Sequence, residues 1–450
     1  MQTPKVKIVI DLGFGDSGKG ALVDFLTREF SGPVVNVRFN GGAQAAHNVV
    51  LPDGRHHTFS QFGSGSFNTE TITYLTEDVI FDPVTILTES KHLQKVIGPN
   101  DPVLQRLFIH PRCKIATPFH KAINRANHMA RTHEISSCGM GISTVMDFEQ
   151  KDLPTIRAED LKDKKYLNTI LGWMKKECLD IFEGIKRNYY LTDPEKIQVM
   201  FKEDMADFFL QCIEMVVDSV SIRDDFQNIA DGKNIVMEGA QGVLLDENFG
   251  FHPYNTWSTC TEKNAVTFLR EHGLYSDYPQ TEVIGIIRSY LTRHGAGPFP
   301  SEANLRSTNE LHNSVGIYQG AFREGFPDML LLRYALRCCS IDSICISHTD
   351  KVQSNVCTSY KTKTHEIKDL FPAEELNGRL YKERDFNMFS SHADDLCRLL
   401  RDSVPVYEQI GDQSIVDVVE RETHHLVSIT GSGPTFENYR RIRRADTSRI

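Results

Sequence analysis

A glycine-rich loop near the N-terminus carries the clearest chemical signal in the sequence. Residues 13–20 read Gly-Phe-Gly-Asp-Ser-Gly-Lys-Gly and lie between an apolar run and a segment with helical spacing. Free backbone amides at the start of a helix, together with the ammonium group of Lys19, suit a bound phosphate. A plain strand-to-helix turn needs one glycine and would not require this cluster. The loop therefore predicts phosphate binding.

Two common nucleotide-binding patterns match this loop in part. Read as GxGxxG, it should be followed by an acidic residue at the end of the second strand, where the chain has Asn40 and Gly41. Read as GxxxxGK[ST], it lacks the hydroxyl that would ligate Mg²⁺, because Gly20 follows Lys19. The metal ligand must then come from elsewhere, and Asp16 inside the loop is the obvious carboxylate.

The elements around the loop predict an α/β fold with a large, mostly parallel central sheet and flanking helices, like that of P-loop nucleotide-binding proteins. Residues 6–12 and 34–39 have strand patterns on either side of a helix expected at about 18–29. Ligand sites in such sheets lie beyond the carboxyl ends of the strands. Further strand-like runs follow at 234–238, 283–291 and 343–350.

A long stretch between these strands, residues 158–230, is mostly helical in pattern. One helical face within it is apolar and predicts a helix that packs on the core, with Phe209, Cys212, Ile213, Val216 and Val220. No internal repeat, low-complexity tract or linker is evident. We therefore expect a single domain over residues 1–450 with a helical insertion at 158–230. The basic run at 440–444 is expected to be a short solvated C-terminal tail.

Composition narrows the class of protein. A net charge of −10 offers no global positive field for nucleic acid. No apolar stretch is long enough to span a bilayer, and the N-terminus leads into a strand rather than a signal peptide. The ten cysteines form no CxxC pairs, and the seventeen histidines include no HExxH. We expect a cytoplasmic protein with reduced thiols and with neither a nucleic-acid nor a membrane partner.

Five segments resemble motifs of the adenylosuccinate synthetase family and keep the family's order. They resemble GDEGKG, GGxxAGH, EGAQGxLLD, PYVT and TRxGAGPFP, and they occupy residues 15–20, 41–47, 238–246, 253–256 and 292–300. The resemblance covers nearly the whole chain. It implies a purine-nucleotide C–N ligase that uses a nucleoside triphosphate to activate the 6-oxygen of a purine monophosphate for attack by an amine.

The resemblance also implies catalytic roles. Asp16 would be the general base that removes the N1 proton, and His47 would stabilise or protonate the transferring oxygen. Lys19 would neutralise charge on the phosphoryl group. Gln241 would contact the purine monophosphate, because its amide can donate and accept at once. Mg²⁺ would be held by Asp16 and the carbonyl of Ala46.

Two groups of binding residues follow from the same resemblance. GTP, the expected co-substrate, would contact Gly15, Ser17, Gly18, Gly20, Asn48, Arg323, His348, Asp350, Ser432 and Gly433. The monophosphate and the amine would contact Gln44, Ser137, Cys138, Gly139, Thr256, Gln319 and Gly320. The family reads guanine with a TKxD motif, in which the aspartate corresponds to Asp350. His348 replaces the lysine of that motif, so ATP or dATP stays open.

Several departures concern the substrates. Ser17 replaces the family's glutamate, and a smaller residue there could accept the 2-amino group of GMP or dGMP in place of IMP. The family's cross-subunit arginine has no clear counterpart, with Arg157 as a nearby candidate, although a homodimer is still expected. In the loop at 318–323, Ala321 replaces one of the arginines that bind aspartate in the family.

Three hypotheses therefore stay open. The first is a ligase that uses IMP, aspartate and GTP to form an N6-succinyl nucleotide through a 6-phosphoryl intermediate, with Arg323 and Arg293 compensating for Ala321. The second is a related ligase that uses (d)GMP or another amine donor. The third is a nucleotide-binding sensor without ligase activity. Retention of Asp16 and His47 argues against the sensor, since binding alone would need neither a base nor an acid.

Overall fold

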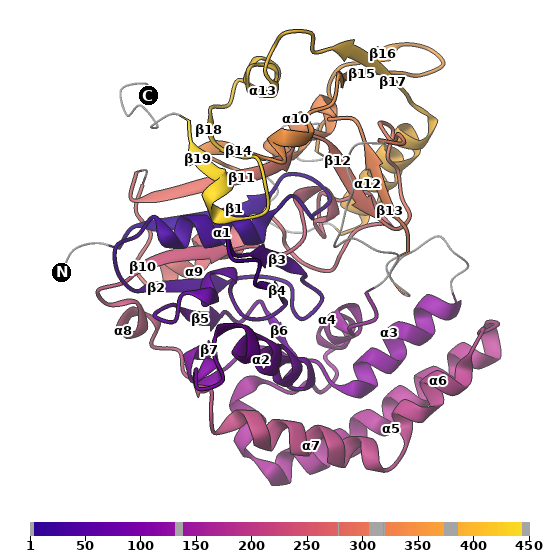
Figure 1. Cartoon of the computed structure of the whole chain (residues 1–450). Coiled ribbons are helices and arrows are strands. Elements are labelled where there is room, and N and C mark those ends of the chain that lie inside the picture. The colour runs from indigo at the N-terminus through magenta and orange to yellow at the C-terminus, as the bar shows by residue number, and fades with distance from the viewer. Residues whose placement is uncertain are drawn as a thin grey trace.

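The computed structural model describes residues 4–130, 138–277, 279–305, 318, 320–372 and 386–442, without the side chains of 386–391. Its main feature is a 10-stranded sheet that runs through the centre of the molecule (Figure 1). The strands, in spatial order, are β19 (Tyr439–Arg441), β18 (Val427–Gly431), β14 (Ser343–Ser347), β11 (Thr281–Arg288), β1 (Val6–Asp11), β10 (Asn234–Glu238), β2 (Val34–Arg38), β5 (Ile72–Leu75), β7 (Leu107–Ile109) and β9 (Ser221–Ile222).

Neighbouring strands of this sheet run parallel, except for β18 and β19, which pair antiparallel. The predicted α/β fold with a large, mostly parallel sheet is confirmed. Strands β2 and β14 are buried at every position, as expected for strands that are covered on both faces. Because the strands are parallel, the loops after β1, β2, β10, β11 and β14 open at one edge of the sheet, and the sequence motifs lie in these loops.

Two predicted elements differ from the structure at their ends. The strand expected at 283–291 is β11, which stops at Arg288, and the chain then turns into β12 (Leu291–His294), which pairs antiparallel with β13 (Phe322–Gly325). The strand expected at 343–350 stops with β14. Its pairing cannot continue because His348 adopts a left-handed conformation (φ 55°). The helix expected at 18–29 is α1 (Lys19–Arg28).

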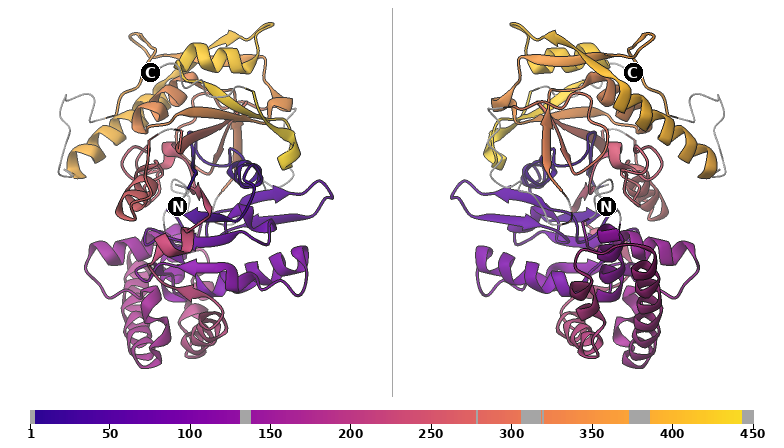
Figure 2. Two further views of the ribbon diagram at one scale, coloured as in Figure 1. Left: turned by 90° about the vertical axis from the view of Figure 1, so that its left-hand side faces the viewer. Right: turned by 90° about the vertical axis from the view of Figure 1, so that its right-hand side faces the viewer.

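The predicted helical stretch contains α5 (Lys164–Asn188), α6 (Pro194–Gln198), α7 (Asp204–Val217) and α8 (Phe226–Ala230). Helix α7 buries Phe209, Cys212, Ile213 and Val216, as expected; Val220 is also buried but lies beyond its end. These side chains belong to a hydrophobic cluster shared with α2 (Pro83–Ile97) and α3 (Pro118–Ala130). In Figures 1 and 2, α5 and α7 lie at one end of the molecule, away from the C-terminal elements.

The remaining helices and strands complete the two ends and the site loops. They are β3 (His47–Val50), β4 (His56–Phe59), β6 (Ile80–Phe81), β8 (Lys114–Ile115), α4 (Ile142–Gln150), α9 (Lys263–Glu271), α10 (Met329–Cys338), β15 (Asn355–Lys361), β16 (Glu366–Ile367), α12 (Phe386–Asp402), β17 (Val404–Gln409) and α13 (Ile415–Thr423). The ten cysteines, all within the described ranges, are free thiols. None of the described helices is long and apolar enough to cross a membrane.

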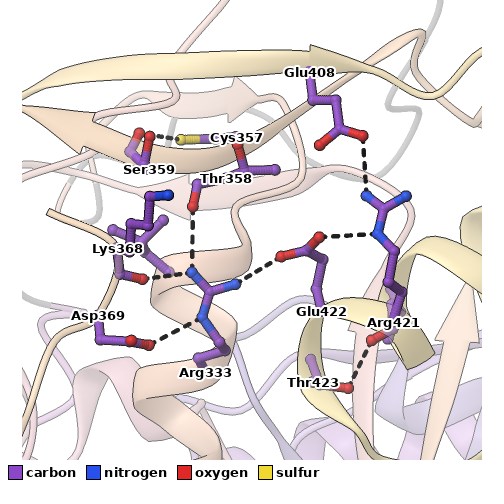
Figure 3. Close-up of polar contacts among 12 residues, drawn as sticks. Arg333, Cys357, Thr358, Ser359, Lys368, Asp369, Glu408, Arg421, Glu422 and Thr423 are labelled. Atoms are coloured by element: carbon purple, nitrogen blue, oxygen red, sulfur yellow. Dashed lines mark hydrogen bonds and ion pairs between the residues drawn. The ribbon is translucent and has the colours of Figure 1, made fainter. Parts of the chain in front are cut away.

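Arg333 on α10 joins the elements at the C-terminal end of the molecule (Figure 3). Its guanidinium donates to the carbonyls of Thr358 and Lys368 and pairs with Asp369 (3.2 Å) and Glu422 (2.9 Å). The side chain is 17% exposed, so these contacts are shielded from much of the solvent. One arginine thus fixes α10 against the 3-stranded sheet of β16, β15 and β17 and against α13.

The expectation of a solvated basic tail is wrong for Arg441. This residue lies in β19, and its guanidinium pairs with Glu29 (2.8 Å) and Glu282 (3.2 Å). The two carboxylates come from the end of α1 and the start of β11, and only the tertiary structure brings them together. Residues 443–450 lie outside the described ranges.

Replacing Arg333 should lower stability without touching the glycine loop. We expect R333A to reduce the free energy of unfolding by about 2 kcal/mol, because two carbonyls and two carboxylates lose a charged donor that is itself largely shielded from solvent. Chemical denaturation measures the change. The matched control is R398A, which removes a surface ion pair whose arginine side chain is 76% exposed. This substitution should change the free energy of unfolding by no more than about 0.5 kcal/mol. Equal effects of the two substitutions would contradict the assignment.

Candidate active site

The carboxylate of Asp11, at the end of β1, organises the glycine loop from within. It accepts hydrogen bonds from the N–H of Gly13 (2.8 Å), from the N–H and hydroxyl of Ser17 (3.1 and 2.9 Å) and from Nζ of Lys19 (2.8 Å). Asp11 is 1% exposed and Lys19 is 3% exposed, and a charge so buried needs such partners. Asp11 is not among the predicted site residues, because its sequence position lies within the strand expected at 6–12.

Left-handed conformations let the loop wrap around this carboxylate. Gly15 and Gly18 both have φ of 90°, and Asp16 has φ of 59°. A Cβ atom on Gly18 would lie 3.1 Å from the hydroxyl of Tyr439 and 3.5 Å from Cβ of Ser347, so this position requires glycine for space as well as for conformation. Aspartate tolerates the left-handed region better than most residues, which allows Asp16 to be held there.

Asp16 is held by two side chains from the β11–β12 segment. Nε2 of His294 lies 3.1 Å from Oδ2 of Asp16, and Nε of Arg288 donates to the backbone carbonyl of Asp16. Burial raises the pKa of Asp16. The opposing effects are larger: they come from the hydrogen bond and charge of His294 and from the charges of Arg288 and Lys19. The pKa of Asp16 therefore lies below its usual value. The side chain is 31% exposed, so it is an ionised carboxylate that a ligand can reach.

His47 begins β3 and is held by Glu238, at the end of β10. Nδ1 of His47 lies 2.5 Å from Oε1 of Glu238. The same Oε1 accepts from the hydroxyl of Ser64, and Oε2 accepts from the N–H of Ser64 (2.9 Å). Burial raises the pKa of Glu238, but the charge of Arg38 and the bonds from His47 and Ser64 bring it to about 2. Burial lowers the pKa of His47 despite this carboxylate. The neutral imidazole therefore donates from Nδ1 and keeps a lone pair on Nε2.

Lys19 links the loops that carry Asp16 and His47. The positive charge of Lys19 lowers the pKa of both side chains. Helix α1 also contacts β3 directly, because a Cβ atom on Gly20 would lie 2.8 Å from the carbonyl of Asn48 and 3.1 Å from Cβ of His47. The glycine loop and the segment after β2, predicted to act together, are therefore neighbours in the structure.

The loop that carries Gln241 packs directly on the glycine loop. A Cβ atom on Gly242 would lie 2.2 Å from the carbonyl oxygen of Gly13 and 2.6 Å from N of Gly15, so no larger residue fits between them. Gln241 itself has φ of 60°, which turns it away from the direction of β10. The side chain of Asn40 binds both the N–H of Ala240 (2.7 Å) and its carbonyl (3.1 Å). Asn40 thus joins the ends of β2 and β10, a role that its sequence context did not reveal.

Gln44 carries an unusual pair of atoms. Its amide nitrogen and oxygen are both buried and lack a hydrogen-bond partner within the described part of the chain. Gln44 lies in the loop after β2, and its amide packs against Gly41 of the same loop. A Cβ atom on Gly41 would lie 3.1 Å from Nε2 of Gln44 and 2.7 Å from Cβ of Ala240. Buried amides are normally paired, so a donor and an acceptor without partners in the loop after β2 indicate a ligand-binding role.

The segment that carries the predicted base-reading residues contacts the glycine loop through Ser347. The hydroxyl of Ser347 donates to the carbonyl of Ser17 (2.7 Å) and lies 2.8 Å from Nδ1 of His348. The hydroxyl of Thr349 donates to the carbonyl of Gly431 (3.2 Å), which brings the 431–434 segment beside this turn. Asp350, Ser432 and Gly433 follow on these two segments, and the first two are exposed. A base bound here would be open to solvent on one side.

The segments predicted to bind the monophosphate and the amine lie against each other. A Cβ atom on Gly139 would lie 2.8 Å from the ring of Tyr318, and one on Gly320 would lie 3.2 Å from Cα of Gly295. Burial raises the pKa of the neighbouring Cys138 thiol. The N–H of Thr256 bonds to the carbonyl of Leu245 (2.8 Å), which places Thr256 beside the loop after β10. Ser137 and Gln319 lie outside the described residues.

The two arginines expected to compensate for Ala321 have partners within the protein. Arg323 forms a two-pronged ion pair with Glu302 and donates to the carbonyls of Gly295 (3.1 Å) and Gly297 (2.9 Å). Arg293 is 1% exposed and donates to three carbonyls, those of Tyr254, Ala296 and Pro298. Burial and the charge of Arg323 lower the pKa of Arg293 to about 9. Both guanidinium groups are bound within the protein and support this loop.

Three further predicted positions contact local partners or are exposed. Oδ1 of Asn48 accepts from Nε2 of His56 and from the hydroxyl of Thr58, both at 2.8 Å, within the β3–β4 hairpin. Arg157, the candidate for a cross-subunit contact, pairs with Glu149 at 2.6 Å. Ala46 is exposed immediately before His47.

Comparison with known proteins agrees with this geometry. A family model described as adenylosuccinate synthetase matches residues 8–439. The adenylosuccinate synthetase of Blochmanniella pennsylvanica is 32% identical over 82% of this chain and 84% of that protein, and that of Chromohalobacter salexigens is 31% identical over 80% of this chain and 82% of that protein.

Two solved structures share the fold. The fully ligated adenylosuccinate synthetase of Plasmodium falciparum has a TM-score of 0.72 at 21% identity, with 98% of this chain and 100% of that chain covered. The succinoaminodeoxyadenylate synthetase (PurZ) of cyanophage S-2L, bound to dGMP and dATP, has a TM-score of 0.59 at 14% identity, with 99% of this chain and 97% of that chain covered. From the family match and its curated relatives, we conclude that the chain belongs to the adenylosuccinate synthetase family of C–N ligases.

Proposed function

We propose that this chain joins aspartate to the 6-position of IMP, with GTP as the energy source, and releases an N6-succinyl nucleotide, GDP and phosphate. The names of its relatives support the reaction class. The observation that carries the proposal is the arrangement of Asp16 and His47. They come from the loops after β1 and β2, the two strands that flank β10 in the sheet, and the positive charge of Lys19 acts on both side chains.

Phosphorylation of the purine oxygen is the first step. The 6-oxo group is a poor leaving group, and transfer of the γ-phosphoryl group makes it a good one. Asp16, ionised because its pKa is lowered, accepts the N1 proton while O6 attacks the γ-phosphorus and GDP leaves. The amine then adds to C6, phosphate departs, and the amine loses its proton.

His47 acts on the oxygen that carries the transferring charge. Glu238 fixes the Nδ1 side of the ring, which directs Nε2 to the ligand side. The negative charge of a bound triphosphate favours protonation of this imidazole, which can then donate to a phosphoryl oxygen. Glu238 therefore orients the ring and stabilises its charged form.

The donor set fits Mg²⁺ bound together with substrate phosphates. No group of three or more His, Cys, Asp or Glu residues in the described ranges could hold a metal alone. Mg²⁺ is commonly held by one or two carboxylates plus phosphate oxygens, and Asp16 with the carbonyl of Ala46 meets that need. When bound, the ion supplies positive charge to the phosphates during transfer.

The structure supports a second candidate for the monophosphate. Ser17 is small and 4% exposed, and its hydroxyl is bound to Asp11, so no bulky acidic side chain stands next to Asp16. We therefore keep GMP or dGMP as an alternative to IMP. Arg323 and Arg293 are paired internally, which keeps a different amine donor open. The triphosphate is proposed to be GTP read by Asp350, with ATP or dATP as the alternative since His348 replaces a lysine.

We further propose that the protein works as a cytoplasmic homodimer, as the family resemblance implies. The free cysteines agree with a reducing compartment. Sedimentation of the purified chain tests the assembly.

The reaction itself is tested by a matrix of monophosphates against amino acids. IMP, GMP and dGMP are each combined with aspartate, other amino acids and a triphosphate, and mass spectrometry identifies the product nucleotide. We expect a succinyl adduct and a stoichiometric release of phosphate. Triphosphate binding without product in any combination would favour the sensor.

D16N should lower kcat by roughly 10²–10⁴-fold, because the general base is lost. The control is D53N, because Asp53 is an exposed carboxylate that pairs with Arg55, and this substitution should leave kcat unchanged.

The positioning of His47 is tested at Glu238. We expect E238Q to lower kcat by about 10²-fold or more with little change in KM, because the amide cannot stabilise an imidazolium. Steady-state kinetics measure both constants. E282Q is the matched control: Glu282 is also buried on a strand of the sheet but pairs with Lys7 and Arg441 at its opposite end. E282Q should lower stability and leave kcat unchanged. Unchanged kcat in E238Q would remove Glu238 from the mechanism.

Gln44 should affect binding and stability in opposite directions. We expect Q44L to raise KM for the monophosphate by about tenfold, because about one hydrogen bond to the ligand is lost. The free protein should melt at the same or a higher temperature, since the substitution removes two buried atoms that have no partner. Kinetics and thermal melting measure the two effects. A lower melting temperature with unchanged KM would show that Gln44 serves packing instead.

A further inference from the structure

His294 occupies the variable position of the TRxGAGPFP segment and contacts the proposed catalytic base. Nε2 lies 3.1 Å from Oδ2 of Asp16, and the side chain of His294 is 22% exposed. The residue ends β12, where it pairs with Phe322 of β13, and the edge of the Phe322 ring packs on the imidazole with centroids 4.9 Å apart. The imidazole therefore lies between the glycine loop and the 318–323 loop.

The backbone on either side of His294 is rigidly held. Arg293 donates to three carbonyls from a buried position, and the N–H of Gly295 bonds to the carbonyl of Ala321 (2.9 Å). A side chain mounted between two such anchors has little freedom to move. Its contact with Asp16 is thus set by the fold and not by a mobile loop.

The second ring nitrogen argues against a simple packing role. Nδ1 of His294 is buried and has no hydrogen-bond partner within the described residues. A histidine kept for structure alone normally has both nitrogens satisfied or exposed, because a buried unpaired polar atom is destabilising. Here the only ring nitrogen with a partner in the described structure is the one that faces Asp16.

Asp16 needs an external anchor of this kind. It has a left-handed backbone (φ 59°), and Arg288 donates to its backbone carbonyl. The contact with His294 is made by Oδ2, the other carboxylate oxygen being Oδ1. A carboxylate that can rotate freely would spend part of its time away from the proton that it must accept.

We propose that His294 is a positioning residue for Asp16: its N–H holds Oδ2 and thereby directs Oδ1 towards the purine N1. This inference rests on the proposed function, because it explains how the carboxylate of the proposed base is oriented. It needs only an N–H donor at the Nε2 position. Glutamine can place an amide N–H near that position, whereas leucine has a similar volume and no donor.

The test compares H294L and H294Q in the full chain. We expect H294L to lower kcat by about 10–100-fold, to leave KM for both nucleotides within about twofold, and to melt no lower than the wild type. H294Q should recover kcat to within about fivefold of the wild type. H252L is the control, because His252 also pairs with an aspartate, Asp394, but its side chain is 48% exposed. It should leave kcat unchanged.

A second readout does not depend on turnover. Crystal structures of the two variants should show one orientation of the Asp16 carboxylate in H294Q and several in H294L. The proposal is overturned if H294L keeps wild-type kcat, if H294Q is as impaired as H294L, or if the carboxylate keeps one orientation in both. A wild-type chain that is inactive across the substrate matrix overturns the proposed function instead, and the crystallographic comparison still decides the role of His294.

Discussion

The buried ion pair between Asp11 and Lys19 is the interaction on which the rest of the site depends. The same carboxylate also holds the amides of Gly13 and Ser17, so one group sets both the shape of the loop and the position of its lysine. Other loops are packed against this shape: the 239–242 loop through Gly242, and the turn after β14 through Ser347. A change in the ion pair would therefore disturb every segment that reaches the phosphate site.

Each reactive group is paired with a partner from another segment of the chain. Lys19 is bound by Asp11, Asp16 by His294 and His47 by Glu238. These pairs orient the groups before a ligand arrives, which is how a preorganised site stabilises developing charge. In the proposed function, this local arrangement of cations and amides outweighs the net charge of −10 where phosphates bind.

The shared fold and the local departures concern different physical requirements. The fold matches the Plasmodium falciparum structure at 21% identity, since buried parallel strands need only apolar residues and not particular ones. Side chains that face ligands are under no such constraint. Ser17, His348 and Ala321 differ from the family motifs at positions predicted to bind the ligands, while Arg293 and Arg323 are bound inside the loop. Fold likeness therefore leaves the substrates to be decided at the site.

The sequence by itself determined the mostly parallel sheet, the glycine loop and the family, because strand periodicity, glycine clusters and ordered motifs are local signals that survive without coordinates. It could not identify Asp11, Glu238, Asn40 or His294 as parts of the site. Their importance comes from partners up to hundreds of positions away, such as His294 and Asp16 or Glu238 and His47. It likewise could not show that Arg293 and Arg323 are paired internally. Hydrogen bonds act over about 3 Å of space whatever the separation along the chain, so only the tertiary structure decided these pairings.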